Sequence, residues 1–153
     1  MRLPAVLLLL FTVGCGRKEI KPPPPPPDER LLEILSSPSI KRGDLVYLFE
    51  KFLGKNLLHP FPDGKLHPEE PVNRVCFAIE LLRIVVEHGL PAVPEDTIEI
   101  KDITPEFYAY LPVKLVVGSG LMELKNGLFL PFEPLSGADA VNSIKKLKEL
   151  WEK

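Results

Sequence analysis

The stretch DGKLHPEEPVN at residues 63–73 is matched 63 positions later by NGLFLPFEPLS at residues 126–136. Each copy opens on a polar residue and a glycine, Asp63-Gly64 and Asn126-Gly127, and then places two prolines at the same spacing. A run of helical character follows each copy. A unit that recurs at a fixed offset predicts one supersecondary structure used twice in a single fold.

The end of each copy has the composition of a helix start. Asn73 and Ser136 stand directly before the helical runs, where their side chains can accept hydrogen bonds from free amides of the first turn. Pro71 and Pro134 restrict the backbone at the approach to each helix, and the glycines permit a tight reversal. Asp139 follows Ser136 by three residues, which predicts a capping box. Folding alone therefore gives these residues a role.

Hydrophobic periodicity predicts an all-α fold for residues 29–153. Two helix–loop–helix repeats, about 40–88 and about 100–152, would pack as one domain with long loops rich in proline and glycine. In the helical run 105–117, Pro112 would either break a short turn over residues 105–110 or stand at the first position of the helix proper. The segment 97–100 allows at most a short strand. The expected helices cover residues 29–35, 40–53, 73–87, 105–117 and 136–152.

Residues 1–14 have the pattern of an export signal. Arg2 precedes an apolar run that is roughly half the ~20 residues needed to cross a bilayer. The Gly14-Cys15 junction resembles the lipobox of bacterial lipoproteins, although Thr12 stands where leucine is usual. The resemblance implies that Cys15 is acylated, for example with palmitate, and becomes the new N-terminus. A simple secretory signal with an incidental cysteine is the alternative.

Six consecutive prolines, Pro22–Pro27, lie within the segment 15–28 that follows. Proline fixes φ and lacks an amide hydrogen, so this run predicts an extended polyproline II rod of roughly 19 Å at ~3.1 Å per residue. A stiff spacer between a membrane surface and a folded domain is the preferred interpretation. A ligand for an aromatic-lined groove is the competing one.

The composition narrows the class of function. Apolar residues make up 45% of the chain, enough for a core, and the formal charge of −2 offers no basic field for nucleic acid. Cys76 is the only other cysteine and is expected to be a small buried hydrophobe. No cysteine pair or regular histidine spacing indicates zinc, and no serine or cysteine has a recognisable base beside it. We therefore expect a protein that is not an enzyme and holds no metal or cofactor.

Both copies resemble S-layer homology repeats, and the likeness covers about residues 40–152. In the first copy it is carried by Leu53-Gly54, Pro62-Asp63-Gly64, Pro68 and Pro71-Val72-Asn73-Arg74. In the second copy it is carried by Asp102-Ile103, Tyr108-Ala109, Gly118-Ser119-Gly120-Leu121, Asn126-Gly127, Phe129, Pro131 and Pro134-Leu135-Ser136. The resemblance implies a helical domain, which in this family usually contains three repeats arranged as a pseudo-trimer.

This family anchors bacterial envelope proteins non-covalently to peptidoglycan-linked polysaccharide, which is often pyruvylated. Its helix start typically reads Thr-Arg-Ala-Glu, with the arginine facing an acidic sugar. Arg74 keeps that arginine, whereas Gly137 replaces it in the second copy, and Lys41-Arg42-Gly43-Asp44 is a faint earlier echo. The resemblance therefore makes Arg74, Asn73 and Ser136 the candidate glycan-binding residues.

A helix start with an arginine such as Arg74 is chemically suited to bind the carboxylate of an acidic sugar. A helix N-terminus presents free amides and the positive end of a dipole, and an arginine can add a two-pronged hydrogen bond to a carboxylate. The alternative is that Arg74 is an exposed arginine paired with Glu69 or Glu70.

These observations predict a lipid-anchored protein of the bacterial cell envelope, on the periplasmic side of a membrane or at the cell surface. Its partners would be the membrane, through Cys15, and cell-wall polysaccharide or peptidoglycan. The alternative is a protein–protein interaction scaffold whose glycan site has decayed, in line with the loss of arginine at Gly137. Two repeats also leave room for a second chain to complete a trimer-like arrangement.

Acylation of Cys15 has a direct test. The intact mass of the protein isolated from its native cells should equal that of residues 15–153 plus fatty acyl groups. A mass without acyl groups would support the simple secretory signal instead.

Overall fold

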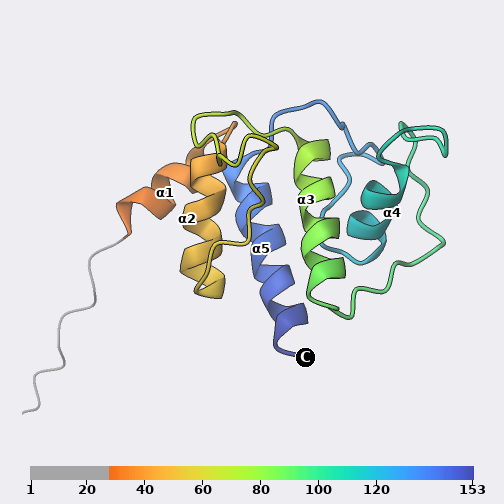
Figure 1. Cartoon of the computed structure of the whole chain (residues 1–153). Helices are drawn as coiled ribbons and strands as arrows, with labels where there is room; N and C mark the ends of the chain where they lie inside the picture. Colours follow the sequence, from red (N-terminus) through yellow and green to blue (C-terminus); the bar gives the residue numbers. More distant parts are fainter. Residues whose placement is uncertain (1–27) are drawn as a thin grey trace, which may run out of the picture.

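The computed structural model describes residues 28–153, and within them five helices are joined by turns and irregular loops, with no strand. The predicted export signal, Cys15 and the proline run lie outside the described residues. The segment 97–100 is turn and irregular backbone. The all-α prediction is confirmed, and the helices are α1 (Glu29–Ser36), α2 (Arg42–Leu53), α3 (Arg74–Glu87), α4 (Tyr110–Gly118) and α5 (Gly137–Trp151) (Figure 1).

Four helices begin within two residues of their expected positions, and α4 is the exception. It begins at Tyr110 rather than at residue 105, and turns occupy residues 105–109. Pro112 therefore stands third in the helix, neither breaking it nor starting it. The first four amides of a helix have no carbonyl partner within the helix, so the missing N–H of proline costs nothing there.

Helices α2, α5 and α3 lie side by side and run in the same direction, so all three begin at one end of the molecule (Figure 1). Helix α4 packs against α3, and α1 packs against α5. The buried apolar side chains form one continuous cluster, which includes Phe49, Phe77, Leu81, Phe129 and Ile144. The core therefore draws side chains from all five helices and from the loop that carries Phe129.

The starts of α2, α3 and α5 are joined by a closed cycle of backbone hydrogen bonds. The amide of Ile40 donates to the carbonyl of Leu135 (3.0 Å), that of Leu135 to Val72 (2.8 Å), and that of Val72 to Ile40 (3.1 Å). Each residue directly precedes the N-cap of its helix, and all three are buried. We call this cycle of Ile40, Val72 and Leu135 the helix-start junction. It joins three segments that are far apart in the sequence.

A second set of bonds surrounds the helix-start junction. The first amide of each helix donates to a neighbouring loop: Arg42 to Glu70 O (2.9 Å), Arg74 to Glu133 O (3.0 Å) and Gly137 to Ser37 O (2.9 Å). Glu70 and Glu133 are related by the 63-residue offset of the sequence. The first amide of each helix, which has no partner within its own helix, is thus bonded to a carbonyl of a neighbouring loop.

The loops before α3 and α5 repeat each other in backbone conformation. Gly64 and Gly127, 63 residues apart, have φ of 79° and 80°, in the left-handed region that favours glycine. His67 and Leu130, at the same offset, also have positive φ, 48° and 57°. The recurrence seen in the sequence therefore corresponds to two loops that reverse at equivalent positions.

Both predicted caps form. The side chain of Asn73 accepts from the amide of Cys76 (2.8 Å), and that of Ser136 accepts from the amide of Asp139 (3.1 Å). The predicted capping box at Ser136 is only half made, because the carboxylate of Asp139 instead pairs with Arg74 and Lys125. A long-range charge has displaced a local bond that the spacing alone predicts.

Gly137 is required by the packing of α1. A Cβ atom at this position would overlap the carbonyl oxygen of Ile34, near the end of α1, whose chain passes directly over the start of α5. The presence of glycine at this helix start, where α2 and α3 have Arg42 and Arg74, thus has a steric reason.

We expect Gly137→Ala to lower the free energy of unfolding by roughly 1–3 kcal/mol, as overpacking of a rigid interior does. Urea unfolding of residues 28–153, followed by circular dichroism, would measure it. Asn142→Ala, an exposed change in the same helix, is the matched control and should stay within about 0.5 kcal/mol of wild type. Equal stabilities for the two variants would contradict the proposed overlap.

Candidate functional site

Arg74, the leading candidate from the sequence, lies inside the protein. Its side chain is 1% exposed although it begins α3. Nε donates to the carbonyl of Phe129 (2.7 Å), Nη2 to that of Glu123 (2.7 Å), and Nη1 to Oδ2 of Asp139 (2.9 Å). All three nitrogens of the guanidinium are therefore bonded to protein groups.

The sequence interpretation of Arg74 as an exposed residue paired with Glu69 or Glu70 is wrong. Glu69 pairs with Lys41 (2.6 Å), while Arg74 is covered by the loop that carries Phe129 and pairs with Asp139. Burial lowers the pKa of Arg74, and the nearby carboxylates oppose that shift. Arginine nevertheless stays protonated at neutral pH. In this conformation an acidic sugar would have to displace the protein's own acceptors.

Arg42, at the start of α2, also donates hydrogen bonds to loop carbonyls. Its Nε donates to the carbonyl of Leu66 (2.8 Å) and its Nη2 to that of His59 (2.6 Å), and the guanidinium lies 4.4 Å from the ring centre of Phe61. Leu66 and Phe129, the Nε acceptors of the two arginines, are separated by the 63-residue offset. The helix-start arginines thus each clamp one loop.

Four of the remaining predicted residues surround the helix-start junction. Asn73 and Ser136 are caps, and Pro71 and Pro134 form isolated backbone bridges with Lys41 and Asn73. The structure therefore brings Asn73, Ser136, Pro71 and Pro134 together at one end of the molecule.

The predicted turn residues lie in the two loops, away from this junction. Asp63 accepts from the amide of Lys65 (2.9 Å) and bonds to the ring of His67 (2.5 Å). Asn126 has φ of 53° beside Gly127 in the second turn. Their contacts are those of turns.

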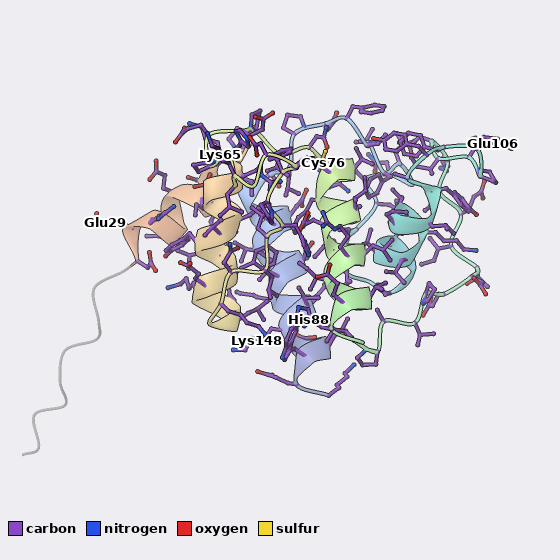
Figure 2. The ribbon with its side chains drawn as sticks, in the orientation of Figure 1. Glu29, Lys65, Cys76, His88, Glu106 and Lys148 are labelled. Atoms are coloured by element: carbon purple, nitrogen blue, oxygen red, sulfur yellow. The ribbon has the colours of Figure 1, made fainter. Side chains whose placement is uncertain are left out.

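An exposed group of aromatic side chains lies on the segments that precede α4 and α5. Tyr108 is 69% exposed and Phe132 68% exposed. Phe107 stands between them, with ring centres 4.6 Å from Tyr108 and 6.1 Å from Phe132. We call Phe107, Tyr108 and Phe132 the aromatic surface. In Figure 2 the labelled Glu106 and Cys76 lie toward the end of the molecule at which α3 begins.

A hollow of about 210 Å³ adjoins the aromatic surface at Phe132, and its other lining residues are Ser39, Pro71, Val72, Asn73 and Pro134. The hollow therefore lies over the helix-start junction. Because first-turn amides there are already bonded to neighbouring loops, this place is a shallow apolar depression and not an anion site.

The charged residues that neighbour the aromatic surface in sequence are acidic. Residues 105–111 and 131–134 include Glu106 and Glu133 and no lysine or arginine. A hydrogen bond from Thr104 lowers the pKa of Glu106, which keeps this carboxylate charged at neutral pH. Exposed aromatic rings with acidic neighbours suit an uncharged or amine-bearing partner and repel an acidic one.

Sequence reasoning missed two features of this end of the molecule. Cys76, expected to be buried, is exposed on the first turn of α3. Partial shielding raises the pKa of its thiol, so it remains protonated. The exposed pair Tyr108 and Phe132 was not singled out as a site, although two aromatic residues flanked by prolines and glutamates at loop positions could have indicated it.

Among the described residues, no group of histidine, cysteine and carboxylate side chains is arranged to hold a metal ion. None of the helices between residues 28 and 153 combines the length and apolar character of a membrane span. Comparisons with protein-family models, curated proteins and solved structures give no match for this chain.

Removing the clamp at Arg74 should destabilise the fold. We expect Arg74→Met to cost about 3 kcal/mol in urea unfolding, because two carbonyls lose their donor and a buried charge pair is broken. Arg42→Met should cost about 1–2 kcal/mol, since its surroundings are partly open to water. An Arg74→Met protein as stable as wild type would show that the clamp does not hold the loop.

Proposed function

We propose that this protein is a non-catalytic, lipid-anchored module of the bacterial cell envelope that binds cell-wall glycan. Acylation of Cys15 would hold it to a membrane, and the proline run would extend its folded part toward the wall. The helical body is proposed to be a pair of S-layer homology-like repeats with a reduced third helix start at Lys41. The 63-residue recurrence in both sequence and loop geometry supports this proposal.

The observation that carries the glycan proposal is the aromatic surface beside the helix-start junction. Sugar rings present apolar C–H faces, which pack flat on exposed tyrosine and phenylalanine rings. Large aromatic side chains left in water on a small domain often mark a binding surface. The acidic neighbours Glu106 and Glu133 favour an uncharged sugar chain, such as the N-acetylated strand of peptidoglycan, over a pyruvylated polymer.

The second candidate is a scaffold for envelope proteins. It is favoured by the structural use of Arg42 and Arg74, the two arginines available for an acidic sugar at the helix starts. Crosslinking in cells separates the two: a protein partner captured at the aromatic surface without glycan would support the scaffold.

Co-sedimentation with purified cell-wall sacculi tests the proposal. Residues 28–153, which contain the whole described core, should sediment with the sacculi. Phe132→Ala and Tyr108→Ala should each weaken binding about 2- to 12-fold, because one aromatic contact contributes roughly 0.5–1.5 kcal/mol.

Val86→Ala is the matched control, because Val86 is 69% exposed but lies near the far end of α3. It should bind like wild type. If wild-type protein stays in the supernatant, glycan binding is refuted. If it sediments but neither aromatic variant weakens binding, the glycan contacts another surface.

A further inference from the structure

His59 joins the loop between α2 and α3 to both helices. Its backbone amide donates to Oε1 of Glu80 (2.8 Å), a largely buried carboxylate on α3. Its carbonyl accepts from Nη2 of Arg42 (2.6 Å), at the start of α2. The loop 54–71, which also supplies Glu70 O to α2, is thus held at one residue from two sides.

The imidazole ring of His59 lies between two carboxylates. Nδ1 contacts Oε1 of Glu80, and Nε2 lies 2.7 Å from Oε2 of Glu87, two turns further along the same helix. A neutral imidazole has a single N–H, so it can donate to only one of these groups. Both contacts are hydrogen bonds only when the ring carries two protons. The side chains of His59 and Glu80 are 18% and 9% exposed, so water replaces these bonds poorly.

Charges around the ring come from two helices. On α3 they are the acceptors Glu80 and Glu87, together with Arg83, which lies 3.9 Å from Glu80. On α2 the guanidinium of Arg42 faces the carbonyl of His59. Burial alone would lower the pKa of His59, but the hydrogen bonds to Glu80 and Glu87 outweigh burial and the repulsion from Arg83, and raise it.

We infer that His59 is a proton-operated latch: the doubly protonated ring strengthens the hold of the loop 54–71 on α3, and loss of a proton weakens it. The two backbone bonds of His59 do not depend on the proton, so the ring adjusts how often the loop opens. In the neutral ring, one nitrogen lone pair faces a carboxylate oxygen, so an attraction becomes a repulsion. His59 itself lies outside the aromatic surface and the hollow beside it, although Pro71, at the end of the same loop, lines that hollow. The tests below read the titration of His59 and the opening of the loop, and neither depends on glycan binding.

The direction of the pH dependence follows from the raised pKa. An unfolded histidine has a pKa of about 6.5, so the latch contributes its full stabilisation below that pH. The contribution is lost as the pH rises through the higher pKa of the folded protein. Each unit by which the pKa is raised corresponds to roughly a tenfold change in the opening equilibrium.

Two NMR measurements on residues 28–153 test the latch. The ring resonances of His59 should titrate above about pH 6.5. Hydrogen exchange of loop amides, corrected for intrinsic rates, should show more frequent opening at pH 8.5 than at pH 5.5. Glu87→Gln should lower the pKa of His59 and reduce this change, and His59→Gln should abolish it.

His88→Gln is the control, because His88 packs against Trp151 and not between carboxylates. It should leave the pH dependence of the loop unchanged. A wild-type His59 that titrates at or below about pH 6.5 would overturn the inference, even if His59→Gln fails to fold. Loop opening with the same pH dependence in wild type and Glu87→Gln would also overturn it.

Discussion

Three backbone hydrogen bonds, from Ile40 to Leu135, from Leu135 to Val72 and from Val72 to Ile40, set the geometry of this protein. They place three helix starts at one point, and α2, α3 and α5 leave it in the same direction (Figure 1). Parallel helices leave long return paths, and the loops that supply them have to be fixed to the bundle. Buried unpaired backbone groups are costly, which makes the closed cycle a strong constraint on all three segments.

The arginines at the helix starts satisfy the need to fix these loops. Arg74 and Arg42 each donate to carbonyls of an irregular loop, which supplies few hydrogen bonds of its own. At the third start α1 passes over Gly137, and its backbone occupies the space that a side chain would need. The first residue of each helix thus depends on what covers it. Arg42 and Arg74 hold loops that lie over α2 and α3, whereas Gly137 leaves room for the backbone of α1 over α5.

This use of arginine changes where a ligand could bind. The guanidinium of Arg74 is buried, and each of its three nitrogens donates to a protein acceptor. The helix starts therefore act as structure, while exposed aromatic side chains beside them meet the solvent. We therefore propose that the ligand stacks on exposed aromatic rings and does not pair with an arginine. An uncharged sugar fits this contact better than an acidic one. The family resemblance alone would have placed the contact at Arg74.

The sequence by itself determined the all-helical class, the caps Asn73 and Ser136, and the reversals at Gly64 and Gly127, because each depends on residues within a few positions of one another. Only the tertiary structure decided that Arg74 is buried and that Cys76 is exposed. The acceptors of Arg74 lie 49, 55 and 65 residues away, so no local pattern could identify them. The helix-start junction could not be identified from the sequence for the same reason. Ile40 has no distinctive neighbours in the sequence, and its hydrogen bonds are to Val72 and Leu135, which are far away along the chain.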